Sequence, residues 1–263
     1  MFQKFQNHLL EEFPDLRQQK ILLALSGGLD SCVLLALCMR EGLQVAIAHC
    51  NFQLRGEQSD EDALWIKKLA AERSLECHIK KFDTINYAEK EKLSVQMAAR
   101  NLRYEWFDAL SAKFSYDAVL VAHHADDALE TFMINTMRGS GLKGLLGIPQ
   151  TRGKIIRPLL PFTRTDVINY ANKHKIDWRE DASNAKTDYL RNVLRHKVIP
   201  NWKATGANLQ DQFRTTLEHL GQAQMALDFV IQDFKTKYFF EAEQQIKISI
   251  DGLKSLRPID FFL

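Results

Sequence analysis

Residues 20–31 read KILLALSGGLDS, and this stretch decides the fold. A short apolar run at residues 20–25 ends at two adjacent glycines, which is the pattern of a buried strand entering a tight turn. Residues 31–39 are apolar on most faces and predict a helix after the turn. A strand, a glycine turn and a helix in succession indicate the first unit of an α/β sheet.

The same alternation continues along the chain. Short apolar runs predict four more strands, at residues 45–49, 78–82, 118–122 and 155–160, with helical patterns between them at 59–73, 95–113 and 126–137. Strands and helices in this order predict right-handed crossovers, and hence a doubly wound, parallel five-stranded sheet with helices on both faces. Ligands bind such sheets at the carboxyl ends of the strands.

The sequence changes character near residue 200. Residues 209–240 predict a long helix, and residues 245–250 alternate between polar and apolar side chains as a strand does. We therefore predict an α/β domain at residues 1–204 and a small, mainly helical domain at residues 205–263, which is either complete or cut short.

Composition argues against several classes of protein. No segment approaches the roughly 18 apolar residues that a transmembrane helix needs, and the N-terminus lacks the cleavage site of a secretory signal. These features predict a cytoplasmic protein outside the membrane. The cysteines form no C-x-x-C pair, so we expect free thiols and no zinc or iron–sulfur centre; they are Cys32, Cys38, Cys50 and Cys77.

The glycine turn has the features of a phosphate-binding loop. Backbone N–H groups at the start of a helix are unpaired and carry a partial positive charge, which favours phosphate. Gly27 and Gly28 let the backbone approach phosphate oxygens closely, and Ser26 and Ser31 add hydroxyl donors. Asp30 repels phosphate, so its expected role is to hold Mg²⁺ that bridges the phosphates. The alternative is an ordinary strand–turn–helix connection in which Ser31 caps the helix.

The string Ser26-Gly27-Gly28-Leu29-Asp30-Ser31 resembles the PP-loop of N-type ATP pyrophosphatases. It lacks the lysine of a Walker loop. The resemblance implies that the loop binds ATP with Mg²⁺, and that ATP is split to AMP and pyrophosphate while a substrate oxygen is adenylated. His49 and His123 follow the second and fourth predicted strands, so we expect them to contribute to the nucleotide site. His123 and His124 are candidates for contact with the nucleotide or for proton transfer.

Six further strings resemble the tRNA(Ile)-lysidine synthetases of this group, and they occur in that family's order. They are AHCNFQLRGEQSDED at 48–62, AARNLRYEWF at 98–107, AHHADDALET at 122–131, RGSGLKGL at 138–145, RPLL at 157–160 and DASNAKTDYLRNVLR at 181–195. With the loop they span about residues 20–200. Phe52 departs from the pattern, because the family often has His there, and the role of this ring is open.

The resemblance implies a ligation on tRNA. ATP adenylates the C2 carbonyl oxygen of the wobble cytidine (position 34) in the isoleucine tRNA with anticodon CAU. Free lysine then attacks C2 through its ε-amine and expels AMP. For the first step, Arg100 and Arg103 lie three residues apart on one helix face and are expected to act as catalytic cations together with Mg²⁺ at Asp30. The alternative is two solvated arginines on an amphipathic helix.

The second step needs carboxylates that attract the lysine cation. Asp127 and Glu130 share a helix face and are expected to recognise lysine, with Asp127 also catalytic. Arg138, Arg191 and Arg195 are expected to bind the tRNA backbone or the activated base; the alternative is solvated surface.

Two other functions stay open at this stage. A tRNA-thiolating enzyme of the PP-loop group is expected to contain C-x-x-C pairs, which this chain lacks. A non-catalytic adenine-nucleotide-binding module would bind ATP without releasing pyrophosphate. The oligomeric state is also open, with a homodimer as one alternative.

Overall fold

The computed structural model of the chain describes residues 1–179, 190–206, 208–242 and 245–251. It forms two compact units, one of residues 1–131 with 148–201 and the other of residues 132–147 with those from 202 onward. Residues 181–189, the first part of the string that ends at Arg195, lie outside the described residues.

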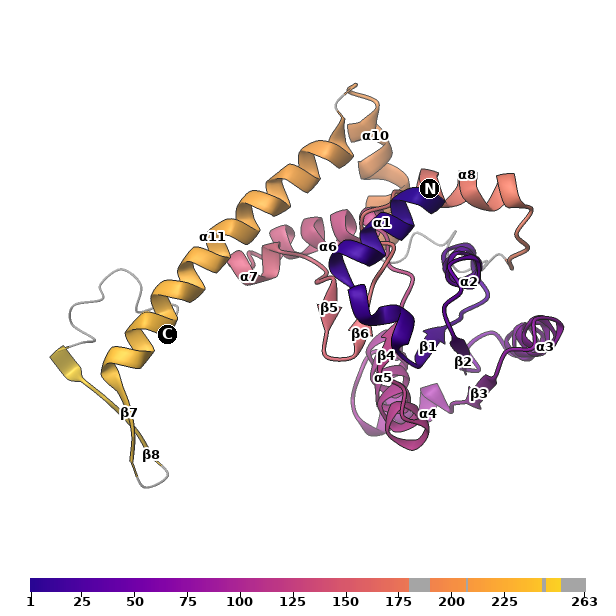
Figure 1. Cartoon of the computed structure of the whole chain (residues 1–263), viewed down its shortest axis with the longest axis horizontal. Coiled ribbons are helices and arrows are strands. Elements are labelled where there is room, and N and C mark those ends of the chain that lie inside the picture. The colour runs from indigo at the N-terminus through magenta and orange to yellow at the C-terminus, as the bar shows by residue number, and fades with distance from the viewer. Residues whose placement is uncertain (180–189, 207, 243–244, 252–263) are drawn as a thin grey trace. The chain divides into compact units, whose positions relative to one another are not determined.

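The elements of the described residues are labelled in Figure 1. The helical elements are α1 (Phe2–Glu12), the 3-10 helix η1 (Pro14–Gln18), α2 (Leu29–Arg40), α3 (Glu57–Glu72), α4 (Thr84–Lys90), α5 (Val95–Phe114), α6 (Ala125–Met137), α7 (Leu142–Leu145), α8 (Arg164–His174), α9 (Leu190–Val193), the π-helical turn η3 (Leu194–Val198), α10 (Ile199–Lys203) and α11 (Leu209–Tyr238). The strands are β1 (Ile21–Ala24), β2 (Val45–Asn51), β3 (Cys77–Lys81), β4 (Ala118–Leu120), β5 (Thr151–Arg152), β6 (Ile155–Ile156), β7 (Phe239–Ala242) and β8 (Gln245–Ile248).

The sheet of the first unit has the strand order β3-β2-β1-β4-β6-β5. All neighbours pair in parallel except β5 and β6, so the predicted five parallel strands are confirmed. The sixth strand, β5, was not predicted. It consists of two exposed residues and therefore leaves no apolar signal in the sequence.

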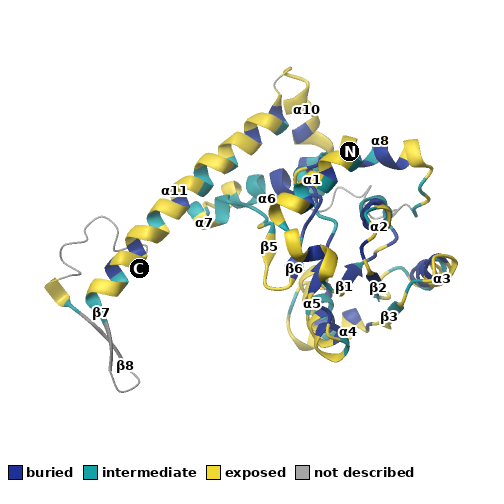
Figure 2. Ribbon diagram, viewed as in Figure 1, coloured by how far each residue is buried: buried dark blue, intermediate teal, exposed yellow. Residues whose placement is uncertain are grey.

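Helices cover both faces of the sheet, as predicted. Along β1 the side chains alternate: Ile21 and Leu23 lie in one core with residues of α1, α2 and α8, whereas Leu22 lies in a second core with residues of α5. Figure 1 shows α2 and α8 on one side of β1 and α5 on the other. The buried residues of β1 and α2 appear dark blue in Figure 2.

The strand order places a switch point between β1 and β4. From β1 the chain moves outward through α2 to β2 and through α3 to β3, and it then returns through α4 and α5 to β4 on the other side of β1. The chain therefore continues from β1 toward one edge of the sheet and from β4 toward the other edge, and open α/β sheets bind ligands at such a point.

The second unit contains the predicted long helix, observed as α11, and the predicted strand, observed as β8 in an antiparallel hairpin with β7. Phe132 of α6 meets Phe213 of α11 edge-on at 5.3 Å between ring centroids. Helix α6 thus begins in the first unit and ends in the second. The division into units differs from the predicted domains in residues 132–147 and 202–204, and the domain boundary after residue 204 stays a prediction.

The four cysteines are free, as the sequence predicted. Among the helices of the described residues, none combines the length and apolar character that crossing a bilayer requires.

The core around the PP-loop helix gives a first prediction. Leu34 of α2 is fully buried, whereas Leu64 of α3 is 67% exposed, and both lie inside helices. We expect Leu34→Ala to lower the free energy of unfolding by about 2–5 kcal/mol. Leu64→Ala should change it by less than about 0.5 kcal/mol. Urea unfolding of the two variants makes the comparison, and equal losses would contradict the observed core.

Candidate functional site

The PP-loop connects β1 to α2 in a conformation that requires glycine. Gly27 has φ +89°, in the left-handed region, and a Cβ there would lie 3.4 Å from the Ile66 side chain of α3. Gly28 is the N-cap of α2, and no side chain caps the helix. Ser31 therefore does not cap α2, and the expected alternative of an ordinary capped turn is wrong. The first-turn N–H groups of α2 are left for an anion.

The two serines of the loop hold its shape. Ser31 Oγ donates to the Gly28 carbonyl at 2.9 Å, and the two hydroxyl oxygens of Ser26 and Ser31 lie 3.0 Å apart. The Gly28 N–H donates to Ser26 Oγ at 3.2 Å. Both hydroxyls are thus already oriented around the loop before any ligand binds.

Asp30 projects from the first turn of α2 toward the residues that follow β4. Its Oδ1 is buried without a hydrogen-bond partner and lies 3.7 Å from Nε2 of His124. Burial raises the pKa of Asp30 above its ordinary value, although His124 and Arg164 oppose the shift. A shielded carboxylate oxygen with no partner fits a cation ligand, so Asp30 could hold Mg²⁺.

Other protein ligands for a metal are few. Among the described residues no three His, Cys, Asp or Glu side chains form a group that would hold a metal by itself. Mg²⁺ commonly binds through one or two carboxylates together with substrate phosphates and water. The donor set therefore fits a magnesium ion that arrives with a nucleotide, as the sequence proposed for Asp30.

His124 is a central residue that the sequence assigned less weight than His123. It is fully buried, and Nε2 lies 3.5 Å from Asp127 Oδ2 as well as near Asp30. Neither ring nitrogen has a hydrogen-bond partner. His124 thus links the PP-loop to α6. The sequence could not show this, because nothing in a pair of adjacent histidines before a helix indicates which ring is buried.

Asp127 and Glu130 form an ionic cluster with Arg191 and Arg195. Glu130 Oε2 lies 2.6 Å from Arg191 Nε, and Glu130 Oε1 lies 2.6 Å from Arg195 Nε. Asp127 Oδ1 accepts from both arginines, at 3.2 and 3.1 Å. Arg191 of α9 and Arg195 of η3 therefore reach the same two carboxylates. Both guanidinium groups contact carboxylates of the protein, which the sequence did not predict.

The pKa values of Asp127 and Asp30 are shifted in opposite directions. Burial alone would raise the pKa of Asp127, but His124, Arg191 and the backbone N–H of His124 outweigh it and hold the pKa below its ordinary value. Asp127 is therefore firmly ionised, whereas Asp30 ionises less readily than a free aspartate.

His123 faces a buried arginine that the sequence did not single out. Arg157 is 3% exposed, and its Nε donates to His123 Nδ1 at 3.3 Å while Nη1 donates to the Pro149 carbonyl at 2.8 Å. Burial lowers the pKa of His123 to about 4, so the ring is neutral at pH 7. Because Nδ1 accepts, Nε2 carries the hydrogen and can donate to a ligand.

Arg100 and Arg103 differ from the paired arginines. Arg103 lies over the Phe52 ring, 5.3 Å from its centroid, and Arg100 lies over the Tyr104 ring at 5.1 Å. In the described part of the chain, no carboxylate forms an ion pair with either guanidinium. Their charges are therefore available to an anionic ligand.

His49 and Arg138 lie outside this cluster of contacts. His49 is buried, and its Nδ1 donates to the Leu25 carbonyl at 2.9 Å, which fixes the end of β1 just before the loop. Arg138 is exposed and belongs to the second unit. Contact of His49 with nucleotide and of Arg138 with tRNA stay predictions.

A second ionic group, also missed by sequence reasoning, supports the PP-loop from outside. The Arg179 N–H donates to the Gly27 carbonyl at 2.9 Å, and its side chain pairs with Asp62 and with Glu61. Asp62 also pairs with Arg55 at 2.7 Å. These contacts hold the acidic end of the string at residues 48–62 beside the loop. Sequence reasoning missed them because the residues in contact lie far apart along the chain and form no motif.

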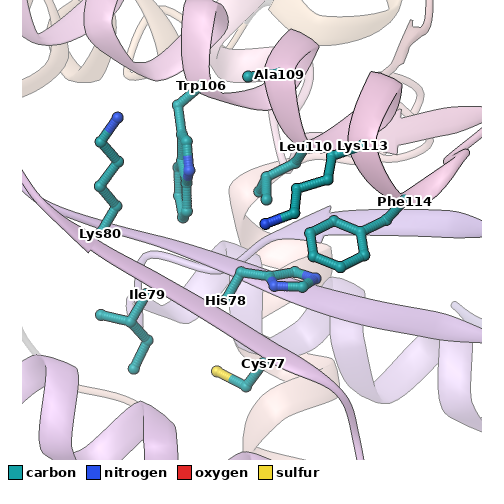
Figure 3. Close-up of a pocket in the computed structure, with 9 residues that line it drawn as sticks. All are labelled: Cys77, His78, Ile79, Lys80, Trp106, Ala109, Leu110, Lys113 and Phe114. Atoms are coloured by element: carbon teal, nitrogen blue, oxygen red, sulfur yellow. The ribbon is translucent and has the colours of Figure 1, made fainter.

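A separate pocket of about 460 Å³ lies between β3 and the second half of α5 (Figure 3). None of the residues predicted for the site lines it. Its lining residues are Cys77, His78, Ile79, Lys80, Trp106, Ala109, Leu110, Lys113 and Phe114.

Known proteins resemble this chain in both sequence and fold. Residues 1–202 match the family model of the PP-loop domain. The tRNA(Ile)-lysidine synthase of Petrotoga mobilis is 31% identical over 250 residues, which cover 94% of this chain and 76% of that protein. The chain belongs to the tRNA(Ile)-lysidine synthase family. Its PP-loop domain implies that the chain binds ATP.

Coverage of other members of the tRNA(Ile)-lysidine synthase family is partial. The protein of Porphyromonas gingivalis is 44% identical over 201 residues, which are 76% of this chain but only 44% of that relative. The U34-tRNA thiolase NcsA from Methanococcus maripaludis aligns with a TM-score of 0.68 and 18% identity, over 83% of this chain and 78% of its own. At that identity the likeness shows a shared fold alone.

The opposite pKa shifts predict opposite effects on stability. The folded-state pKa of Asp30 is raised, so its ionised form weakens the fold once the pH rises above the ordinary value of 3.8. The folded-state pKa of Asp127 is lowered, so its ionised form stabilises the fold above 3.8 and this contribution is lost as the pH falls through the lower folded value. At pH 7, Asp30→Asn should raise the Tm and Asp127→Asn should lower it.

Thermal unfolding in metal-free buffer at pH 7 and near pH 3 tests this pair. The Tm difference for Asp30→Asn should largely disappear near pH 3, and the difference for Asp127→Asn should begin to shrink as the pH falls below 3.8. A lower Tm for Asp30→Asn at pH 7 would show that Asp30 has a stabilising partner and contradict the unpaired carboxylate.

Proposed function

We propose that this chain carries out ATP-dependent ligation of lysine to C2 of the wobble cytidine in the isoleucine tRNA with anticodon CAU, releasing AMP and pyrophosphate. The supporting observation is that the buried ring of His124 lies beside both the PP-loop carboxylate Asp30 and Asp127, and that Asp127 and Glu130 contact the same two arginines. A nucleotide loop and a cation-binding acidic pair at one edge of the sheet are what adenylation followed by amine attack requires.

In the proposed first step the chain neutralises the triphosphate. The first-turn N–H groups of α2 bind phosphate oxygens, and Arg100 and Arg103 add cations that no carboxylate of the described residues neutralises. Mg²⁺ held at Asp30 would supply Lewis-acid stabilisation of the departing pyrophosphate. His123, neutral at pH 7, offers its Nε2–H as a donor to the nucleotide or the base.

In the proposed second step the ionic cluster receives lysine. The cluster contains two carboxylates and two guanidinium groups, which complements a zwitterion that carries both charges. We assign the ammonium group to Asp127 and Glu130 and the α-carboxylate to Arg191, whose side chain is 40% exposed against 21% for Arg195. The low pKa of Asp127 suits it to binding a cation and makes it a weak base.

Two observations favour this reaction over tRNA thiolation. No two cysteines form a C-x-x-C pair. Burial also raises the pKa of Cys50 to about 12 and that of Cys32 to about 12, so neither thiol is an accessible thiolate at pH 7. A cysteine-dependent sulfur transfer therefore has no reactive thiol near the PP-loop.

The reaction is tested with ATP, Mg²⁺, labelled lysine and the CAU-anticodon isoleucine tRNA. We expect tRNA-dependent pyrophosphate release and a labelled nucleoside with the mass of lysidine, and Asp30→Asn should reduce both at least about 100-fold. ATP binding without any tRNA-dependent pyrophosphate release would favour a non-catalytic nucleotide module. Pyrophosphate release with incorporation of sulfur would favour the thiolase alternative.

The lysine assignment is tested with Arg191→Ala and with lysinamide, which lacks the α-carboxylate. Loss of a charge-assisted hydrogen bond should raise the KM for lysine roughly 10-fold or more and leave the KM for ATP nearly unchanged. Wild type should discriminate against lysinamide, and Arg191→Ala should not. The exposed Arg152 provides a control, since Arg152→Ala should keep the wild-type preference. If Arg191→Ala still discriminates against lysinamide as strongly as wild type, a residue other than Arg191 binds the α-carboxylate.

A further inference from the structure

Phe52 occupies the position where the sequence pattern of the family often has His, and the structure fixes its ring firmly. It follows β2 directly, and its carbonyl accepts a hydrogen bond from Thr84 Oγ1 at 2.9 Å. Its ring stacks on Phe82 with centroids 5.6 Å apart and planes inclined by 25°. Phe82 in turn meets Trp106 of α5 edge-on at 5.8 Å. The hydrogen bond therefore fixes the backbone of Phe52, and the contact with Phe82 fixes one face of its ring.

Arg103 lies over this ring, at 5.3 Å between the guanidinium carbon and the centroid. That distance is within the range of a cation–π interaction. The Arg103 charge also helps to keep the pKa of His123 low, which places the guanidinium near the residues that follow β4. No carboxylate of the described residues forms an ion pair with Arg103, so the ring of Phe52 supports a guanidinium whose charge stays uncompensated.

We propose that Phe52 is a positioning residue that holds Arg103 toward the nucleotide without neutralising its charge. The use of Arg103 on phosphate rests on the proposed function. An acidic partner would hold the guanidinium too, but would compete with phosphate for it, as the carboxylates beside Arg191 and Arg195 do. An aromatic face attracts the cation through its quadrupole and leaves the N–H donors at the guanidinium edge free.

The aromatic ring also makes this support independent of pH. Histidine at the same position would be cationic below about pH 6.5 and would then repel Arg103. Among the described residues, the charged and titratable groups near this position are Arg103 of α5, Cys50 of β2, Lys80 over the Phe82 ring, and Asp60 of α3 with its ion-pair partner Lys81. Asp60 also accepts hydrogen bonds from Asn51 and Gln53. Burial raises the pKa of Cys50 to about 12, and hydrogen bonds from Lys81, Gln53 and Asn51 lower the pKa of Asp60, so neither titrates near 6.5.

The test compares Phe52→Leu, Phe52→Tyr and Phe52→His with wild type in tRNA-dependent pyrophosphate release. Phe52→Leu removes the aromatic face and should slow release about 2- to 30-fold, whereas Phe52→Tyr should restore it. The rate of Phe52→His relative to wild type should fall as the pH drops through about 6.5. Phe114→Leu is a matched control, because Lys113 lies over that ring at 5.1 Å in the separate pocket (Figure 3). It should leave the rate unchanged.

A second readout does not depend on catalysis. The Nε–Hε resonance of Arg103, assigned with Arg103→Lys, should carry a ring-current shift that Phe52→Leu abolishes and Phe52→Tyr retains. Loss of this shift, with no turnover even in wild type, would support the contact and reject the proposed function. An unchanged resonance in Phe52→Leu, an unchanged rate, or a Phe52→His profile parallel to wild type would overturn the inference.

Discussion

A buried carboxylate oxygen without a hydrogen-bond partner is the constraint on which the site depends. Asp30 lies in the first turn of α2, and its Oδ1 lies 3.7 Å from Nε2 of the buried His124 ring, beyond hydrogen-bond distance. Burying an unpaired carboxylate destabilises a fold. The surrounding apolar core opposes this effect, because Val33, Leu34 and Leu37 of the same helix are fully shielded from water. Helix α2 is thus tightly packed along its buried side, while Asp30 Oδ1 in its first turn has no hydrogen-bond partner.

The arginines around this carboxylate fall into two groups with different consequences. Arg191 and Arg195 are paired with Asp127 and Glu130, so their charges are largely neutralised until something competes for those acids. Arg103 rests on an aromatic ring and keeps its full charge. A triphosphate can therefore bind Arg103 without breaking an ion pair. A zwitterionic amino acid can instead bind the paired group, because its ammonium group can replace a guanidinium beside the acids and its carboxylate can replace an acid beside an arginine.

The fold and the nucleotide loop were predictable because their signals are local in sequence. Apolar runs marked the five parallel strands, and the pair Gly27-Gly28 marked a turn that indeed contains a positive φ. Contacts between distant residues were not predictable. Sequence identified the charges of Arg191 and Glu130 but not their pairing, because each could equally face solvent. Arg179 carried no motif, and its link to Gly27 exists only once the chain has folded.

The balance of charge around Asp30 favours a metal that arrives with the nucleotide. Around Asp30 and the two histidines, the carboxylates of Asp30, Asp126, Asp127 and Glu130 stand against the guanidinium groups of Arg103, Arg164, Arg191 and Arg195, so the net charge of these groups is close to zero. Two of these arginines already contact the acids, and Arg157 is committed to Pro149 and His123. An ATP triphosphate carries more negative charge than the remaining cations can balance in a low-dielectric setting. A divalent ion at Asp30 would offset this excess of negative charge and would also give the unpaired Oδ1 a ligand. The free energy lost by burying Asp30 would then be recovered when ATP binds with its metal ion.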